Sequence, residues 1–166
     1  MTYDLTSYLD PRTICLHLQV TDREEAIRLL GKRLEEGGIV KGSFAEAAIA
    51  RERELPTGLP ISDDINVAVP HTDPEHVLKP GLALGILDRP VEFASMDDPT
   101  QPLPVRVVFV MALAEREAQI DMLQSIVEVI QRREVLDAVV AARSPEEVLA
   151  ALKQAATTDG ATAGTT

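Results

Sequence analysis

The chain has 166 residues, of which 45% are hydrophobic and 3% aromatic, and its 16 basic and 27 acidic side chains give a formal net charge of −11. This length supports one domain with a sizeable core, and the apolar content excludes an intrinsically disordered chain. No apolar run approaches the ~20 residues of a membrane span, and the acidic excess argues against nucleic acid as a partner, because nucleic-acid binding depends on cationic contacts to phosphate.

The first part of the chain predicts a strand, two helices and a loop, in that order. Residues 13–20 alternate between apolar and polar side chains, which is typical of a half-buried strand. Its apolar face is expected to hold Ile14, Leu16, Leu18 and Val20. Capping-box patterns beginning at Thr21 and Ser43 predict helices that end near Glu36 and Leu55. Proline, glycine and aspartate then indicate a loop over residues 56–64.

The remaining segments complete an α/β pattern. Apolar runs predict strands over residues 65–69, 82–87 and 105–113, the last one central in a sheet. Helical spacing predicts a helix over residues 115–131, and a proline-containing capping box starts a last helix at residue 144. The apolar face of the helix over 115–131 is expected to contain Ile120, Leu123, Val127 and Ile130. We therefore expect a single α/β domain over residues 1–154, with a mixed β-sheet flanked by helices, and a flexible tail over residues 155–166.

One cysteine and the first ten residues bear on the cellular compartment. Cys15 has no partner for a disulfide within the chain, which suits a reducing compartment. The segment M-T-Y-D-L-T-S-Y-L-D has neither the basic nor the apolar region of a signal peptide. These features predict a cytoplasmic protein without direct membrane insertion.

The common phosphate-binding and metal-binding motifs are incomplete. Gly37 and Gly42 have the first spacing of a P-loop, but Ser43 stands where the phosphate-binding lysine is needed. The sequence contains no G-x-G-x-x-G, H-E-x-x-H or paired C-x-x-C motif. Cys15 and His17 share one face of the first strand, which fits either the start of a metal site or a buried thiol beside an ordinary histidine. We expect no metal.

His71 differs from the other histidines in its setting. It follows V-A-V-P directly, at the end of a predicted strand, where ligand sites gather at the edge of an α/β sheet. Pro70 stiffens the approach and limits where the imidazole points. Taken alone, His71 fits a functional or an ordinary histidine equally well. His17 lies in mid-strand, and His76 is expected on the surface.

Two segments carry short motifs that belong together. The first, A-R-E-R-E-L-P-T-G at residues 50–58, contains Arg-Glu near a helix end and Thr-Gly in a loop. The second, I-N-V-A-V-P-H at residues 65–71, contains the apolar-Ala-apolar-Pro-His pattern. Together they resemble the enzyme IIA components of the phosphoenolpyruvate-dependent sugar phosphotransferase system (PTS), in the fructose–mannitol (type 2) superfamily. The resemblance extends over roughly residues 13–151, including V-E-F at residues 91–93 and the strand V-R-V-V-F-V.

The resemblance implies that His71 is the phosphoryl acceptor. The phosphoryl group would come from a phosphohistidine on the carrier HPr and pass to a cysteine of a sugar-specific enzyme IIB, with the enzyme IIC transporter as a separate chain. Histidine suits this task because an imidazole with a pKa near ~6.5 is largely a neutral nucleophile at pH 7. Such a relay needs no ATP, Mg²⁺ or other cofactor.

The resemblance also implies a set of phosphate-binding residues. Arg51 would stabilise charge on the phosphoryl oxygens, although alone it also fits a solvated helix residue paired with nearby glutamates. Thr57 would donate its hydroxyl and Gly58 would let the backbone approach, although the same residues fit a simple turn.

Gln119 marks a departure from many mannitol and fructose members, which carry a second histidine at the start of the helix after the central strand. Glutamine can hydrogen-bond a phosphate without becoming a cation, and the start of a helix favours an anion. With the Pro-Thr-Gly run, this residue makes the chain most similar to the galactitol-type enzyme IIA. Gln119 also fits a surface residue of the first helical turn.

Two alternative functions are a regulatory enzyme IIA and a histidine-based hydrolase. A nitrogen-related regulatory enzyme IIA carries a phosphorylatable histidine as well, but acts by binding partners according to its phosphorylation state. A histidine-based hydrolase is disfavoured, because no serine or cysteine lies in a recognisable nucleophile elbow.

Overall fold

The computed structural model describes residues 4–164. Its centre is a five-stranded sheet in the order β1-β4-β5-β3-β2. The β1–β4 and β3–β5 pairs are parallel, whereas the β4–β5 and β2–β3 pairs are antiparallel. The strands are β1 Ile14–Leu18, β2 Gly58–Leu59, β3 Asn66–Ala68, β4 Gly81–Ala94 and β5 Pro102–Ala112. The predicted mixed sheet in a single α/β domain is confirmed.

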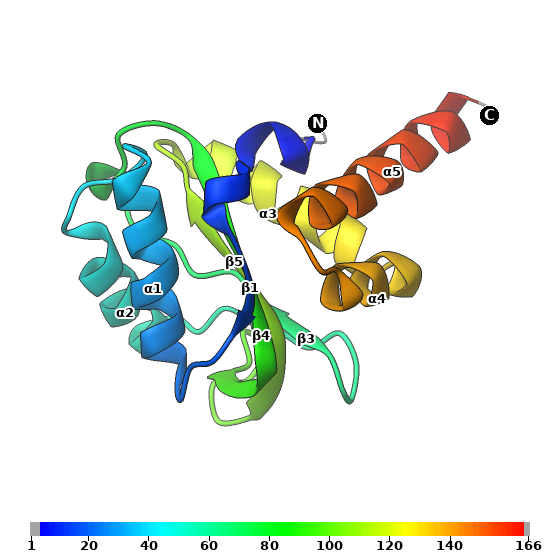
Figure 1. Ribbon diagram of the computed structural model, residues 1–166. Coiled ribbons are helices and arrows are strands. Elements are labelled where there is room, and N and C mark those ends of the chain that lie inside the picture. Colours follow the sequence, from blue (N-terminus) through cyan, green and yellow to red (C-terminus); the bar gives the residue numbers. More distant parts are fainter. Residues whose placement is uncertain (1–3, 165–166) are drawn as a thin grey trace.

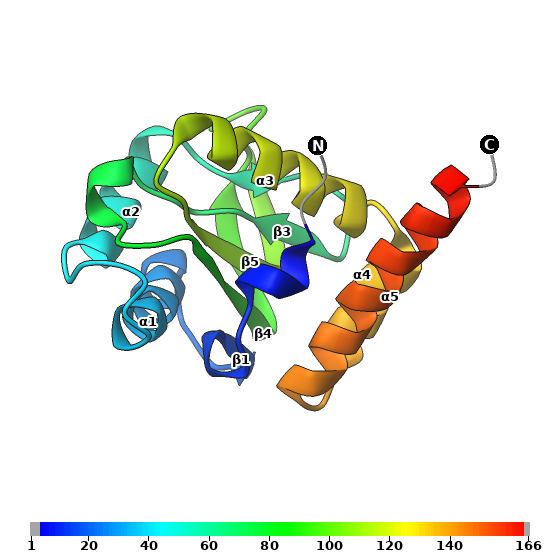
Figure 2. The same ribbon diagram turned by 90° about the horizontal axis from the view of Figure 1, so that it is seen from above.

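Helices cover both faces of this sheet (Figure 1). The α-helices are α1 Arg23–Glu36, α2 Phe44–Glu54, α3 Arg116–Ile130, α4 Arg133–Ala141 and α5 Pro145–Gly164. The short 3₁₀ turns are η1 Leu5–Tyr8, η2 Pro11–Thr13 and η3 Pro74–His76. Seen from above, α1 and α2 lie on one side of the sheet, and α3, α4 and α5 lie on the other (Figure 2).

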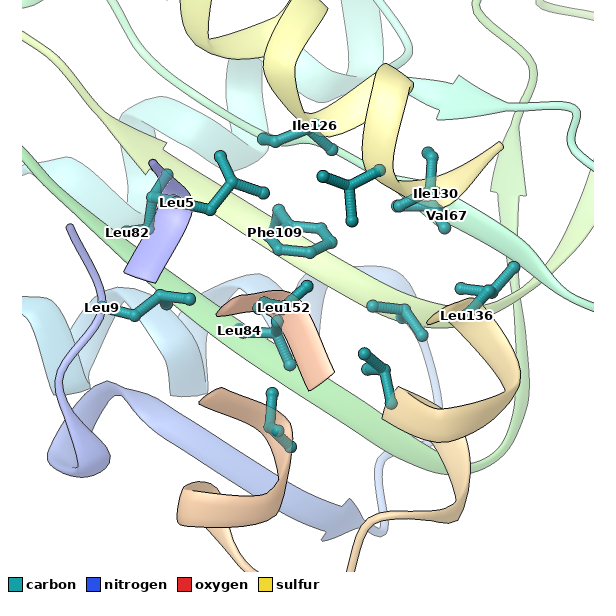
Figure 3. Close-up of a cluster of buried hydrophobic side chains, with 14 of the residues drawn as sticks. Leu5, Leu9, Val67, Leu82, Leu84, Phe109, Ile126, Ile130, Leu136 and Leu152 are labelled. Carbon is teal, nitrogen blue, oxygen red and sulfur yellow. The ribbon is translucent and has the colours of Figure 1, made fainter. Parts of the chain in front are cut away.

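The core is correspondingly divided into two layers by the sheet. One layer joins α3, α4, α5 and the N-terminal segment to the sheet around the fully buried Phe109 (Figure 3). The other layer packs α1 and α2 against the opposite face of the sheet around Phe44 and Phe93. Because both faces are buried, the central strands are apolar on both sides, as their sequence predicts.

The alternation predicted for the first strand fails at His17. This residue has a positive φ of 52°, and the register with β4 shifts between Cys15 and Leu18. Leu18 consequently packs on the α1–α2 side together with Cys15, whereas Ile14 and Leu16 pack on the other side. His17 itself is exposed, so it does not share a site with the buried Cys15.

The boundaries of α1 and α2 differ from the predicted ones by single residues, for local reasons. Asp22, not Thr21, caps α1, because its carboxylate accepts the Glu25 N–H at 2.8 Å. Thr21 instead donates its own N–H and hydroxyl to the Glu25 carboxylate, both at 2.8 Å. Ser43 precedes α2 without a side-chain cap, since its hydroxyl pairs with Nδ1 of His76 at 2.8 Å.

Strand β4 is much longer than predicted. The run D-R-P at residues 88–90 suggests a turn, but it forms an irregularity in the register between Ile86 and Val91, after which pairing with β5 resumes. Arg106, the one charged residue of the apolar β5 segment, donates to the Leu87 carbonyl at this point, at 2.9 Å. The side chain therefore binds a backbone carbonyl beside the irregularity.

The C-terminal third contains two further differences. Helix α4 was not predicted separately. Ile120 of α3, expected on the apolar face, is 57% exposed, because the buried face of α3 is formed by Met122, Ile126, Val129 and Ile130. Helix α5 continues to Gly164, past the expected end at residue 154, since extending an existing helix is much easier than starting one. Flexibility of this stretch stays a prediction. Among the described residues, no helix is both long and apolar enough to cross a membrane.

Candidate functional site

The site lies at one edge of the sheet, where β3 and β5 end side by side. These strands are parallel, so the segments that follow them emerge at the same edge. Strand β3 leads through Val69 and Pro70 to His71, and the Met111 N–H donates to the Pro70 carbonyl at 2.9 Å. Strand β5 leads into α3, and the last turn of α2 brings Arg51 to the same place.

A shallow depression of about 220 Å³ opens at this edge. Its lining residues are Arg51, His71, Asp73, Met111, Arg116, Gln119, Ile120 and Leu123. The structure therefore brings together three of the predicted site residues, His71, Arg51 and Gln119.

The imidazole of His71 is held by its own backbone neighbourhood. Its Nδ1 lies 3.0 Å from the Val69 carbonyl oxygen. A carbonyl oxygen only accepts, so Nδ1 carries the proton and Nε2 carries the free electron pair. Burial lowers the pKa of His71 below its usual value, and the charge of Arg51 acts in the same direction, whereas the hydrogen bond to Val69 and the charge of Asp73 oppose the shift. His71 is therefore a neutral imidazole with a nucleophilic Nε2 at pH 7.

Two guanidinium groups supply positive charge to the depression. Nη1 of Arg51 pairs with the Asp73 carboxylate at 3.0 Å, while its Nε is buried and, within the described chain, has no hydrogen-bond partner. Arg116, in the first turn of α3, makes no ion pair with another described residue. Unused donors on both groups can bind the oxygens of an anion.

Thr57 does not line the depression. It is buried, and its hydroxyl donates to the Glu52 carboxylate at 2.7 Å and accepts the Val69 N–H at 3.2 Å. The Glu52 carboxylate also accepts the Thr57 N–H at 2.8 Å, and burial raises the pKa of Glu52. This chain of hydrogen bonds connects α2 to Val69, whose carbonyl orients His71. Thr57 thus acts on the histidine through the backbone.

Gly58 also lies away from the depression, and glycine is needed there for close packing against β4. A Cβ at this position would lie 2.5 Å from the carbonyl oxygen of Ala94, closer than such atoms approach one another. The Gly58 carbonyl in turn accepts the Met96 N–H at 2.7 Å. The close approach that glycine permits here is to the end of β4.

Gln119 ties two loops together. Its Nε2 donates to the carbonyl of Thr72 at 2.9 Å and to that of Leu113 at 3.4 Å. Because these partners are carbonyls, the amide orientation is fixed, and both N–H donors are occupied. Direct donation from Gln119 to a phosphate requires it to release one of these carbonyls.

Sequence reasoning missed Asp73, Arg116 and the exposed Ile120 of this site. Asp73 stands two residues after His71, in the run P-H-T-D-P. Arg116, Gln119, Ile120 and Leu123 follow the spacing of one helical face, so their grouping around Gln119 was readable in principle. The described residues contain no cluster of His, Cys, Asp and Glu side chains that could hold a metal ion.

A half-buried histidine with a free Nε2 thus lies beside two guanidiniums at the edge of an α/β sheet, an arrangement that can bind an anion. Residues 7–155 match the family described as phosphoenolpyruvate-dependent sugar phosphotransferase system, EIIA 2. The chain belongs to this family, and the predicted family is confirmed.

Similar proteins bear sugar-specific names. The 2-O-α-mannosyl-D-glycerate-specific EIIABC component of Escherichia coli is 29% identical over 90% of this chain, which spans only 22% of that protein's length. The galactitol-specific EIIA component of Escherichia coli is 24% identical over 74% of this chain and 81% of its own. The solved complex of enzyme IIAMTL and phosphorylated enzyme IIBMTL from Escherichia coli is similar in fold, with a TM-score of 0.67, 26% identity, and coverage of 87% of this chain and 96% of that one.

Proposed function

We propose that the chain is a phosphocarrier that accepts a phosphoryl group on Nε2 of His71 from phospho-HPr and passes it to a sugar-specific enzyme IIB. The observation that carries the proposal is the Nδ1–H hydrogen bond to Val69, which leaves Nε2 nucleophilic in a residue that lines the same depression as Arg51 and Arg116. Family membership and the fold similarity to a IIA–IIB complex support the enzyme IIB partner. The predicted cytoplasmic location belongs to the same proposal.

The transfer needs no proton movement. The Nε2 electron pair attacks phosphorus, the N–P bond of the donor breaks, and the donor nitrogen keeps the electron pair of that bond. The His71 ring then carries both its Nδ1 proton and the phosphoryl group, so it becomes cationic, and the Val69 carbonyl stabilises this form through a charge-assisted hydrogen bond. In the second step a cysteine thiolate of enzyme IIB supplies the electron pair for an S–P bond. The N–P bond to Nε2 of His71 breaks, and its electron pair returns to Nε2.

Arg51 and Arg116 stabilise the charge that spreads over the phosphoryl oxygens during both steps. Gln119 and Thr57 hold the loops on either side of His71, through the Thr72 carbonyl and the Val69 N–H respectively. Gly58 lets the start of β2 lie close to the end of β4. The exposed Ile120 and the half-buried Leu123 beside the depression offer an apolar surface on which the protein partners can dock.

The test is incubation with phosphoenolpyruvate, enzyme I and HPr, followed by detection of acid-labile phosphate. We expect uptake by the wild-type chain and by His76→Ala, the matched control, and none by His71→Ala. Absence of uptake by the wild type, or persistent uptake by His71→Ala, contradicts the proposal.

For the acceptor we propose an enzyme IIB of the galactitol type. The similarity to the galactitol-specific EIIA component over most of that protein's length, and glutamine at position 119, support this choice. Faster transfer from the phosphorylated chain to a galactitol enzyme IIB than to a mannitol enzyme IIB is the expected result. Failure to transfer to any enzyme IIB would instead favour the regulatory alternative, in which the phosphorylated histidine controls partner binding.

A further inference from the structure

Asp73 holds the guanidinium that a phosphoryl group on His71 would need. Nη1 of Arg51 lies 3.0 Å from Oδ1 of Asp73, and both residues line the depression together with His71. The Asp73 side chain has no capping role, although the residue precedes η3. Its carboxylate therefore binds Arg51 and does not cap the adjacent 3₁₀ turn.

We infer that Asp73 is a positioning residue that competes with the phosphoryl group for Arg51 and thereby keeps the phosphoryl group easy to release. The inference rests on the proposed phosphocarrier function. Asp73 sets how readily the chain donates the phosphoryl group relative to how readily it accepts it. Before transfer, Arg51 pairs with Asp73. After transfer, Arg51 turns to the phosphoryl oxygens, and Asp73 loses its partner.

The charges in the depression support this exchange. A phosphoryl group with two negative charges on a cationic ring gives the modified His71 a net charge of −1, which meets a second negative charge at Asp73. Arg51 retains unused donors, including the buried Nε, so it can change partners without leaving the site. The phosphorylated form thus gains Arg51 at the expense of Asp73, and Asp73 lowers its stability.

A carrier benefits from such a competitor, because it must release what it accepts. A site that bound the phosphoryl group as tightly as two guanidiniums allow would accept rapidly and donate slowly. The Arg51 and Asp73 side chains are 31% and 54% exposed, so solvent screens the pair and limits the effect of the competition. Exposed ion pairs of this kind correspond to changes of about two- to fivefold in an equilibrium constant.

The experiment compares Asp73→Asn with the wild type in equilibrium with a fixed ratio of phospho-HPr to HPr. We expect the ratio of phosphorylated to free chain to rise about two- to fivefold, and donation to enzyme IIB to slow by a similar factor. Asp88→Asn is the control, since it makes the same change in net charge at an exposed position of β4 that does not line the depression. This control should leave the equilibrium ratio unchanged.

A double-mutant cycle then tests the route through Arg51. If Asp73 acts by holding Arg51, Asp73→Asn has no effect on the equilibrium ratio in an Arg51→Ala background. An unchanged or lower ratio in Asp73→Asn alone, or the same rise in both backgrounds, overturns the inference. Lack of phosphoryl uptake by the wild type would instead overturn the proposed function, so the two failures are distinguishable.

Discussion

Arg51 occupies the last turn of α2, where one of its donors pairs with Asp73 and a buried one stays unused in the described part of the chain. We predict that Arg51→Ala slows phosphoryl uptake from phospho-HPr by about a hundredfold, the cost of losing one charge-stabilising group from a transition state. Rapid-quench kinetics measures this rate. Arg53→Ala, which removes an exposed ion pair with Glu24 from the same helix, should transfer at the wild-type rate.

The lowered pKa of His71 gives a pH signature to the same site. The folded state holds the imidazole neutral, so fewer protons bind to it than in the unfolded chain. This contribution to stability is present above about pH 6.5, the unfolded value, and is lost as the pH falls through the folded pKa. In an NMR titration, the signal assigned with a His71→Gln variant should have its midpoint below 6.5. A midpoint at or above 6.5 would contradict the burial of the imidazole.

The segment from the end of α2 through β2 to β3 orients His71 through buried hydrogen bonds. Thr57→Val keeps the shape of the side chain but removes the hydroxyl from both Glu52 and the Val69 N–H. We predict a loss of about 1–3 kcal/mol in the free energy of unfolding, because Oε1 of the buried Glu52 loses its hydrogen-bond donor, together with slower phosphoryl uptake.

Urea denaturation measures this loss, with Thr100→Val as the control. The Thr100 hydroxyl donates to Asp98 at 2.7 Å, but the pair is exposed, so its removal should cost less than about 0.5 kcal/mol. Equal losses in the two variants would show that the Glu52–Thr57–Val69 connection contributes no more than a surface contact.

The elements that carry the site were predictable where a local pattern determines the structure. Pro56 follows the last turn of α2, and Pro70 separates the short apolar strand from His71. Arg51 and His71 were therefore expected at the ends of these elements. Gln119 was likewise expected in the first turns of the helix after the central strand.

The partners of these residues were not predictable, because they depend on how distant elements meet. The Arg51–Asp73 pair joins α2 to the loop after β3, and the Gln119 amide reaches the Thr72 carbonyl across 47 positions of sequence. The Thr57 hydroxyl likewise accepts the Val69 N–H from twelve positions away in the sequence. The family resemblance implies a direct contact of Thr57 with phosphate, whereas the structure gives it a contact with the backbone that holds His71.

At the scale of the whole molecule, the net charge of −11 contrasts with the two guanidiniums of the depression. The acidic surface can draw in the basic face of a carrier, and screening by salt weakens this attraction. We predict that the second-order rate of uptake from phospho-HPr falls as salt rises from about 0.05 to 0.5 M. A rate that stays constant over this range would show that the acidic surface does not speed the encounter with phospho-HPr by electrostatic attraction.

The nitrogen that carries the phosphoryl group is the most direct test of the account. The measurement is ¹⁵N and ³¹P NMR of the chain labelled with ¹⁵N-histidine and phosphorylated with phosphoenolpyruvate, enzyme I and HPr. The account predicts coupling of phosphorus to Nε2 of His71, because Nδ1 donates to the Val69 carbonyl. Coupling to Nδ1, coupling to His17 or His76, or no phosphorylation at all would contradict it.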